Sequence, residues 1–590
     1  MRIRYGMPFA AALLAGSIVT AAAQTPPVVF LDQGLGWDSV KRLDYYSRDQ
    51  GSRIMPLDWL EALKLPNGQP FLADGLARYG YLPNPDNASG LPVGFVASGP
   101  TGAQNVGMTC SACHTRQITV AGTHYRIDGG PAIVDFQSFL SDLDTAVGSV
   151  VASDAAFAPF AAAVLHSASP APADVAALRG AVDGWYLRYH TLILRALPKE
   201  QPWGPARLDA IGMIFNRLTG LDIGPPPSFL IPDNIKLADA PARYPFLWNA
   251  SRQDLTQWPG FADNGNDILG LSRNLGEVFG VFAVFQPTND GVLVNYLNDN
   301  SANFDGLSAL EDLIKKIGPP RWPWQINSDL ADEGRTIFQR PTAQGGCADC
   351  HAIKLGKVRG LEPTWATPVQ NVGTDTREWG VLDWSVDTGV LKGAFIPLVT
   401  DPLLENDKAF KVLATSVIGS IAERVLTGGG ILLDAAQAVG EVKGATPHLL
   451  KGRLPPQLRA LEGAFRPPGN LPGFKPLGVP NAPSPPTRGS YESRVMQGIW
   501  AAAPYLHDGS VPTLAELLKP ANERVKSFKI GSNYDIENIG LAVEQTQFGF
   551  TLETTDCSDL NSGRSRCGHE FGTQLKPEEK KALLEYLKTL

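Results

Sequence analysis

The sequence is poor in basic residues and in long apolar runs, and each shortage excludes a class of function. Its 590 residues include 51 Lys and Arg against 59 Asp and Glu, which gives a formal net charge of −8. Nucleic acids and anionic membranes are bound by basic surfaces, so neither is an expected partner. No uninterrupted apolar stretch of about 18 residues follows the first 23 positions, so we expect no membrane span in the mature chain.

The N-terminus, in contrast, has the pattern of a secretory signal peptide over residues 1–23. Arg2 and Arg4 give a positive start, residues 8–19 are largely apolar, and three alanines precede Gln24. Small residues at that place suit cleavage, and the apolar run is shorter than a membrane span; an uncleaved anchor is the alternative. The sequence therefore predicts a periplasmic or secreted protein.

Cysteine is also scarce, and its six copies are not scattered. Four of them form two copies of a C-x-x-C-H motif, namely Cys110-Ser-Ala-Cys113-His114 and Cys347-Ala-Asp-Cys350-His351. This is the attachment pattern of haem c, because two thiols three positions apart reach the two vinyl groups and the adjacent His reaches the iron. A redox C-x-x-C needs no His, and a zinc site needs further Cys or His pairs at close spacing. We therefore predict two covalently attached haem c groups with His114 and His351 as iron ligands.

The other two cysteines, Cys557 and Cys567, lie near the end of the chain. An exported protein resides in an oxidising compartment, so a disulfide between them is expected. A free thiol pair is the alternative.

The length requires at least two domains, and the haem motifs suggest where they lie. We predict a mainly α fold with two cytochrome c-like haem domains, 96–318 and 321–590, joined at a proline-rich linker and decorated by long irregular insertions. Residues 24–95 form an N-terminal extension that wraps the first domain. Apolar residues at helical spacing predict a helix before the second motif and another at the C-terminus, where Pro577 suits the first helical position. A proline-rich stretch, 454–486, is expected to be extended.

Two haem motifs about 237 residues apart resemble the bacterial dihaem cytochrome c peroxidase superfamily. The segment SRVMQGIWAAAPYLHDGSVPTL (493–514) resembles its A-P-Y-x-H-x-G-S-x-x-T-L stretch. The surroundings of the first motif, RNLGEVFGVF (273–282) and CGHEFGTQL (567–575) resemble the longer, rubber-oxygenase-like branch. The resemblance implies an oxidoreductase in which the second haem passes electrons to the first. It also allows a calcium ion between the domains, without assigned ligands.

The sixth ligand of each iron decides whether the site transfers electrons or binds a substrate. Compact dihaem peroxidases place a Met 14 residues after the His that corresponds to His507, but here that position is Ala521. In the long branch the resemblance implies a His at the place of His569, which we predict as the second ligand of the second haem. His507 or a structural histidine remains the alternative. His124 is either a satisfied loop histidine or a removable ligand of the first haem, and His166 and His190 are expected to be structural.

Peroxide cleavage at an open first haem needs an acid/base, and Glu277 is the candidate. It lies in SRNLGEVFGVFAVF, where apolar residues form one helical face, so its pKa is expected to be raised. Compact peroxidases have a glutamate in this role, whereas the rubber-oxygenase branch is apolar there; a solvated helix glutamate is the alternative. Trp248 and Trp258 are candidates for the distal pocket or for an electron relay between the haems, or are ordinary core residues.

These observations favour reduction of hydrogen peroxide at the N-terminal haem, with electrons delivered through the C-terminal haem. The predicted catalytic residues are Glu277, His114 and Trp258. A small redox protein of the cytochrome c or cupredoxin type is the expected electron donor. A dioxygenase that cleaves an apolar unsaturated substrate with O₂ and a non-catalytic dihaem electron carrier are the alternatives.

Overall fold

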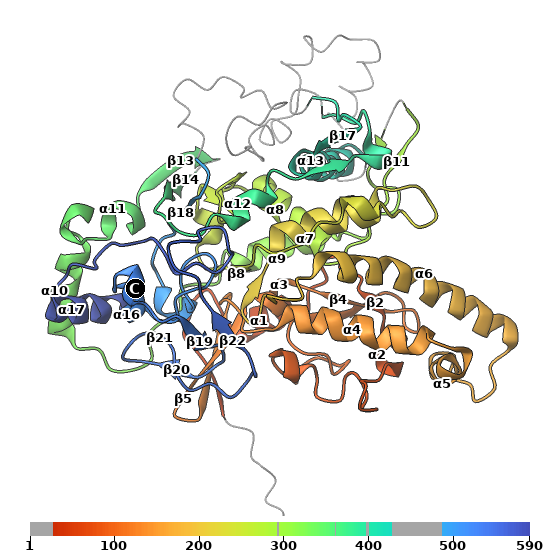
Figure 1. The fold of residues 1–590 in the computed structure, drawn as a ribbon, viewed down its shortest axis with the longest axis horizontal. Coiled ribbons are helices and arrows are strands. Elements are labelled where there is room, and N and C mark those ends of the chain that lie inside the picture. Colours follow the sequence, from red (N-terminus) through yellow and green to blue (C-terminus); the bar gives the residue numbers. More distant parts are fainter. Residues whose placement is uncertain (1–26, 292–293, 360–361, 397–400, 428–486) are drawn as a thin grey trace, which may run out of the picture.

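The computed structural model describes residues 27–291, 294–359, 362–396, 401–427 and 487–590. The predicted signal peptide, 1–23, and the predicted extended stretch, 454–486, lie outside the described residues. The fold is mixed: helices are joined by long connections that pair into small sheets of two or three strands (Figure 1). The expectation of a mainly α fold is therefore met only in part, because the glycine- and proline-rich connections form many short ribbons.

Helices form most of the regular structure. The longer ones are α1 (Ser39–Ser47), α4 (Phe136–Val151), α5 (Asp154–Val164), α6 (Pro172–Ala196), α7 (Ala210–Arg217), α8 (Asp267–Gly280), α9 (Phe304–Ile314), α10 (Ser328–Phe338), α13 (Ala409–Thr427) and α17 (Pro577–Leu587). The short ones include α2 (Leu57–Ala62), α3 (Cys110–Cys113), α11 (Ala348–His351), α12 (Arg377–Val381) and α16 (Leu514–Leu517).

The strands are short and pair mostly in antiparallel fashion. Those of the N-terminal half are β1 (Val28–Phe30), β2 (Met55–Pro56), β3 (Phe95–Ser98), β4 (Asn105–Met108), β5 (Thr115–Val120), β6 (Thr123–Asp128), β7 (Arg207–Leu208) and β8 (Ala242–Arg243). Those of the C-terminal half include β13 (Leu355–Arg359), β14 (Glu362–Trp365), β15 (Val369–Asn371), β18 (Ser490–Glu492), β19 (Ser527–Lys529) and β22 (Thr551–Glu553). Parallel pairing of β1 with β6 brings the start of the described chain against the β5–β6 hairpin that follows the first C-x-x-C-H motif.

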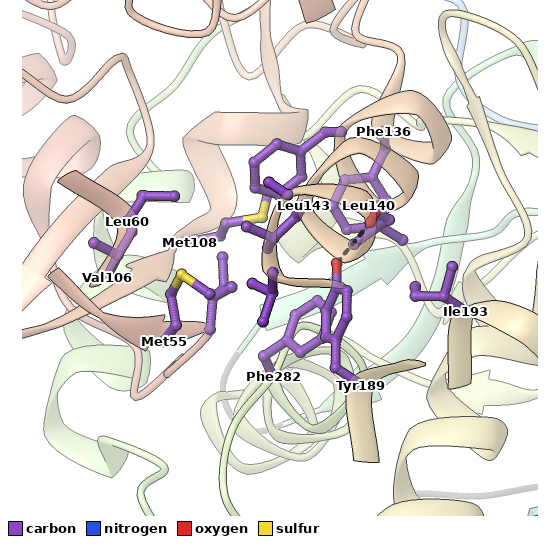
Figure 2. Close-up of a cluster of buried hydrophobic side chains, with 14 of the residues drawn as sticks. Met55, Leu60, Val106, Met108, Phe136, Leu140, Leu143, Tyr189, Ile193 and Phe282 are labelled. Atoms are coloured by element: carbon purple, nitrogen blue, oxygen red, sulfur yellow. Dashed lines mark hydrogen bonds between the residues drawn. The ribbon is translucent and has the colours of Figure 1, made fainter. Parts of the chain in front are cut away.

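A hydrophobic core under the first motif is built from α4, α6 and the sheet β2–β4–β3 (Figure 2). Met55 and Met108 face Phe282 and Tyr189 across this core, and the Tyr189 hydroxyl donates a hydrogen bond to the Leu140 carbonyl (3.1 Å). Burial of such side chains is the main favourable contribution to folding. The core fixes the short helix α3, which carries Cys110 and Cys113.

The N-terminal extension is fastened to the first haem region by one buried carboxylate, Asp128 at the end of β6. This carboxylate accepts hydrogen bonds from Trp37 Nε1 (2.7 Å), Arg42 Nε (2.7 Å) and the Tyr46 hydroxyl (2.5 Å). The Tyr45 hydroxyl donates to the backbone carbonyl of His114 (3.0 Å). Helix α1 therefore packs directly behind the haem motif.

The C-terminal region has the two helices that its sequence predicts. Helix α10 begins at an Asn327 cap, helix α17 has Pro577 in its first turn, and the two pack against each other at the left of Figure 1. Their contact is close at Gly334, where a Cβ atom would lie 1.9 Å from the Ala582 carbonyl oxygen. Glycine at this position lets the helices approach to backbone distance.

The regions around the two C-x-x-C-H motifs share buried contacts, although one buried cluster, 54–282, belongs to the first region alone. Trp248 Nε1 of the first region donates to the Gln497 carbonyl (2.8 Å), and the Arg243 backbone N–H donates to the His507 carbonyl (2.8 Å). Arg116 donates to the Ala503 carbonyl as well. One buried cluster contains residues of both regions. The predicted limits 24–95, 96–318 and 321–590 stay a prediction.

No single helix in the described ranges is long and apolar enough to cross a membrane. Helices α4 and α5 are long and apolar enough only when they are taken together, and the chain bends by 107° between them.

Candidate haem sites

The first C-x-x-C-H motif opens onto a cavity, which we call the N-terminal cavity. Its lining encloses about 1290 Å³ of empty space, which includes solvent at its open mouth. Cys110, Cys113 and His114 line it together. His114 Nδ1 lies 2.8 Å from the Pro245 carbonyl oxygen, which assigns the proton to Nδ1 and leaves Nε2 for a metal. Burial lowers the pKa of His114 to about 4, so the imidazole is neutral.

Glu277 lines the same cavity from helix α8. Its carboxylate accepts a hydrogen bond from Gln257 Nε2 (2.7 Å). Burial raises the pKa of Glu277, while the Gln257 hydrogen bond and the Arg273 charge oppose this shift. Gln257 has a backbone φ of 66°, a conformation uncommon outside glycine that gathers at functional sites. The structure thus brings a partly buried carboxyl and a partly buried amide into the cavity that contains His114.

The second motif opens onto a C-terminal cavity of about 1240 Å³, again counted to its mouth. Cys347, Cys350, His351 and His569 line it. His351 Nδ1 lies 2.7 Å from the Arg494 carbonyl oxygen, which leaves Nε2 free in the same way as in His114. The ring centres of His351 and His569 are 6.1 Å apart. Two imidazoles that bind one metal ion through nitrogens at about 2 Å each have ring centres roughly 6 Å apart, so this pair fits one haem iron.

The loop that carries His569 is held on several sides. The disulfide Cys557–Cys567 closes the preceding ten residues, and Arg524 donates to the carbonyls of Arg566 and Gly568. His569 Nδ1 is buried without a hydrogen-bond partner in the described part of the chain. Burial, reinforced by His351 and Arg524, lowers the pKa of His569 to about 3, so this imidazole is neutral, as a ligand must be.

One wall separates the two cavities. The residues that line both are Arg243, Phe246, Trp258, Glu492 and Arg494. Trp258 Nε1 donates to the Arg243 carbonyl (3.1 Å), and the Arg243 guanidinium lies 4.7 Å from the Trp258 ring centre. Trp258 therefore lies between the two cavities, whereas the sequence left Trp248 and Trp258 both open for such a position. Trp248 stacks on Phe246 and is not among the lining residues of either cavity.

Arg243 and Arg494 fit a second feature of haem, its two propionate groups. Both guanidinium groups are fully buried, and neither forms an ion pair with a carboxylate among the described residues. Arg494 Nε has no hydrogen-bond partner there. Within the described residues, the charge of Glu492 acts on Arg494 and that of Asp508 acts on Arg243, but neither carboxylate forms a direct ion pair with these groups. A bound carboxylate group at this wall would give the two buried cations a direct partner.

The remaining histidines lie elsewhere. His507 lines the C-terminal cavity, but its ring stacks on Tyr491 with centres 3.6 Å apart. His124 lies in β6, and its Nδ1 is 2.9 Å from the hydroxyl of Thr119 in β5. It lines neither described cavity. His190 contacts Asp144 (2.9 Å), and His166 follows helix α5. In the described ranges, no three His, Cys, Asp or Glu side chains form a further metal cluster, and the calcium ion stays a prediction.

Sequence reasoning missed several residues that line the cavities: Gln50, Arg243, Gln257, Glu378, Glu492 and Arg494. Of these, Gln257 could have been suspected from the sequence, because it directly precedes the candidate Trp258. Arg494 lies in the quoted segment 493–514, but the resemblance gave it no role. The others come from segments far apart in the chain that no motif marks. Gln50 shows that the N-terminal extension contributes to the first site.

Comparisons with known proteins agree with a haem c protein. Residues 490–529 match the family described as RoxA-like, cytochrome c-like. The chain is 30% identical to y4iJ, an uncharacterized protein of Sinorhizobium fredii, over 95% of this chain and 93% of that protein. It is 22% identical to y4iM of the same organism, also uncharacterized, over 58% of this chain and 63% of that protein. The cytochrome c-like domain and the disulfide are both consistent with a location outside the cytoplasm.

Proposed function

The chain belongs to the same protein family as y4iJ, and we propose that it is an exported dihaem c-type cytochrome that reduces hydrogen peroxide in its N-terminal cavity. The observation that supports this reaction is the hydrogen-bonded, partly buried Glu277–Gln257 pair in the cavity of His114. The haem that Cys110 and Cys113 would attach supplies an iron that exchanges electrons and binds a small oxygen ligand.

The protein groups around that position have separate tasks. Glu277 takes a proton from one peroxide oxygen and returns it to the other, which is the task of a general acid/base. Gln257 orients the carboxyl through the 2.7 Å hydrogen bond and has a second amide hydrogen to offer. Burial raises the pKa of Glu277 above that of an exposed glutamate, which makes its carboxylate a stronger base.

The C-terminal site would collect electrons. His351 and His569 would bind its iron from both sides, which closes it to substrates and suits electron transfer. Trp258 lines both cavities and offers an aromatic ring between them. We propose that a small redox protein of the cytochrome c or cupredoxin type is the donor.

A dioxygenase is the second candidate, and two observations favour it. Residues 490–529 match the RoxA-like family, and apolar side chains such as Leu208, Ile211 and Ile314 line the N-terminal cavity. A carrier without catalytic activity is the third. It would need a sixth ligand in that cavity, where Met108 is the one methionine among the lining residues.

A spectrum and a turnover assay separate the three. We expect the isolated protein to show one six-coordinate low-spin haem and one high-spin haem that binds cyanide; two low-spin haems would establish the carrier. Peroxide turnover with a reduced small cytochrome is expected to fall about 10²–10⁴-fold in Glu277→Gln. Asp267→Asn, an exposed change on the same helix, is the control. Full turnover in Glu277→Gln, or a stable oxygenated haem without peroxide turnover, would reject the peroxidase.

A further inference from the structure

The proposed reaction creates a demand for protons that Glu277 cannot meet. Reduction of one hydrogen peroxide by two electrons consumes two protons and yields two water molecules. Glu277 only returns the proton that it takes from peroxide, so its net contribution is zero. Two further protons must reach a cavity whose walls are largely apolar and buried. Beside solvent at the mouth, a second proton-exchanging group on the cavity wall would supply them.

Glu378 has the position for this task. It belongs to helix α12, lines the N-terminal cavity and is 5% exposed. Its Oε2 has no hydrogen-bond partner among the described residues. The helix is fixed to strand β18 by a hydrogen bond from Trp379 Nε1 to the Ser490 carbonyl (2.8 Å). A buried carboxyl oxygen without a partner is costly unless it is protonated or bound to water.

The surroundings of Glu378 favour its protonated form. Burial raises its pKa well above the ordinary range, and the carboxylates of Asp209, Asp508 and Asp375 reinforce this shift. Positive groups also face this cluster: Arg207 and Arg243 act on Asp508, and Arg377 pairs with Asp239. Arg488 acts on the neighbouring Tyr491. Like charges in a buried site cannot all be ionised at once. The cluster therefore retains protons at neutral pH.

The same region contains other buried polar atoms that lack partners in the described part of the chain. They are Tyr491 OH, Asp508 Oδ2 and Arg207 Nε. The Tyr491 pKa is raised by burial and by the charges of Glu378, Asp375 and Asp508, which places its ring beside this cluster. Several unpartnered polar atoms in one place are the usual setting of buried water. Such water connects carboxyl groups that do not touch.

A route from the cluster to solvent passes through Asp209. Its carboxylate accepts hydrogen bonds from the backbone N–H groups of Gly212 (2.8 Å) and Ala240 (3.0 Å). Burial raises the pKa of Asp209 to about 7, and Asp239 contributes to this shift. Asp239 accepts from Arg377 Nε (2.9 Å), and their side chains are 27% and 37% exposed. The carboxyls of Glu378, Asp209 and Asp239 thus lead from the cavity to the surface.

We propose that Glu378 delivers the protons consumed in the N-terminal cavity and is reprotonated from solvent through Asp209 and the Asp239–Arg377 pair. This inference rests on the proposed peroxide reduction. In each step the Glu378 O–H bond breaks toward a cavity water, and the resulting carboxylate takes a proton from Asp209 through intervening water. Asp209 is reprotonated in turn by a proton that comes from solvent water at the Asp239–Arg377 pair. Glu378 is a proton-delivery residue and need not touch peroxide.

The first test does not involve turnover. Infrared spectroscopy of the ferric holoprotein at pH 7 is expected to show a carbonyl stretch of a protonated carboxyl that shifts in D₂O. This band should disappear in Glu378→Gln and persist in Asp233→Asn, a surface change. If the band is unchanged in Glu378→Gln, Glu378 does not store the proton and the inference is wrong.

The second test measures proton supply during peroxide turnover with a reduced small cytochrome. We expect Glu378→Gln to lower kcat at least tenfold with little change in KM and to increase the solvent isotope effect. Glu378→Asp, which retains the carboxyl, should recover most of kcat and is the second variant if the first fails to fold. Asp209→Asn should lower kcat in the same direction. Unchanged kcat in Glu378→Gln together with a loss in Glu277→Gln would overturn proton delivery alone, whereas no turnover in the wild type would overturn the peroxidase.

Discussion

His569 has a backbone conformation that few residues other than glycine adopt. Its φ is 51°, and the preceding Gly568 has a φ of 76°. A Cβ on Gly568 would lie 2.4 Å from the Gly373 carbonyl carbon, so the loop is pressed against residues 373–374. Left-handed non-glycine residues cost about 1–3 kcal/mol and persist where the surroundings enforce them. The chain accepts this cost at the residue whose ring faces His351.

The first prediction concerns this residue. His569→Ala is expected to convert the low-spin haem of the C-terminal site to a high-spin form, because the site loses the only second imidazole that faces His351 in the described structure. Added imidazole should restore the low-spin spectrum. The measurement is the visible spectrum of the ferric holoprotein.

His507→Ala is the matched control, since His507 lines the same cavity but stacks on Tyr491. It should retain the low-spin haem. The assignment would be wrong if His507→Ala, and not His569→Ala, changed the spin state.

The second prediction concerns the pH dependence of Glu277. The carboxylate accepts a proton from peroxide, so kcat/KM should fall as the pH is lowered through the Glu277 pKa. Burial raises this pKa above the usual glutamate value of 4.5. The acid limb of the profile should therefore lie above pH 4.5 and vanish from the residual activity of Glu277→Gln. A limb at or below 4.5 in the wild type would contradict the assignment.

The sequence contains clear signals for residues in local motifs and none for residues brought in by the fold. The C-x-x-C-H motifs, His569 and Glu277 were all predicted from short segments, and the structure places each in a cavity. Arg243 and Glu378 have no such segment, because their positions depend on contacts with chain more than a hundred residues away. Trp248 and Trp258 were both candidates for a place between the sites, and only packing shows that Trp258 lines both cavities.

At the scale of elements, the same distinction separates helices from strands. The helices α10 and α17 were predicted because apolar spacing and end signals are local properties. The ribbon of β15 with β18 joins Val369 to Glu492, and the parallel pair β1–β6 joins Val28 to His124. Pairing over such separations depends on the whole fold. Strands of two or three residues are also too short to show an alternation of apolar and polar residues in the sequence.

The third prediction concerns helix α1, which depends on Asp128. Asp128→Ala would leave three donors without their acceptor: the buried Trp37 and Tyr46 and the partly buried Arg42. Breaking a buried pair of this kind costs about 3–5 kcal/mol of the free energy of unfolding. Guanidinium unfolding of the holoprotein, followed by circular dichroism, measures this loss.

Asp44→Ala is the control on the same helix. Asp44 pairs with Arg48 at the surface, so its loss should cost at most about 1 kcal/mol. Equal effects of the two changes would show that Asp128 does not fasten the N-terminal extension.

At the scale of the whole molecule, the segment around residues 490–511 joins the two haem regions. Its backbone carbonyls accept hydrogen bonds from Arg116, Trp248 and Arg243 of the first region. Its side chains Glu492 and Arg494 line both cavities. A wall made in this way cannot form in one region without the other. The sequence indicates two haem units by its two motifs, but it does not reveal that the units share a wall.

The fourth prediction follows from that shared wall. The holoprotein should unfold in one cooperative transition, in which the helical signal and the absorption of both haems change together. The chain cut at the proline-rich linker near residue 320 should lose this cooperativity, because residues 96–318 alone would expose Trp248 and Phe246, which are buried here. Thermal unfolding followed at three wavelengths makes the comparison. Two separate transitions, or a fragment 24–318 that binds one haem and unfolds sharply, would show that the regions are independent domains.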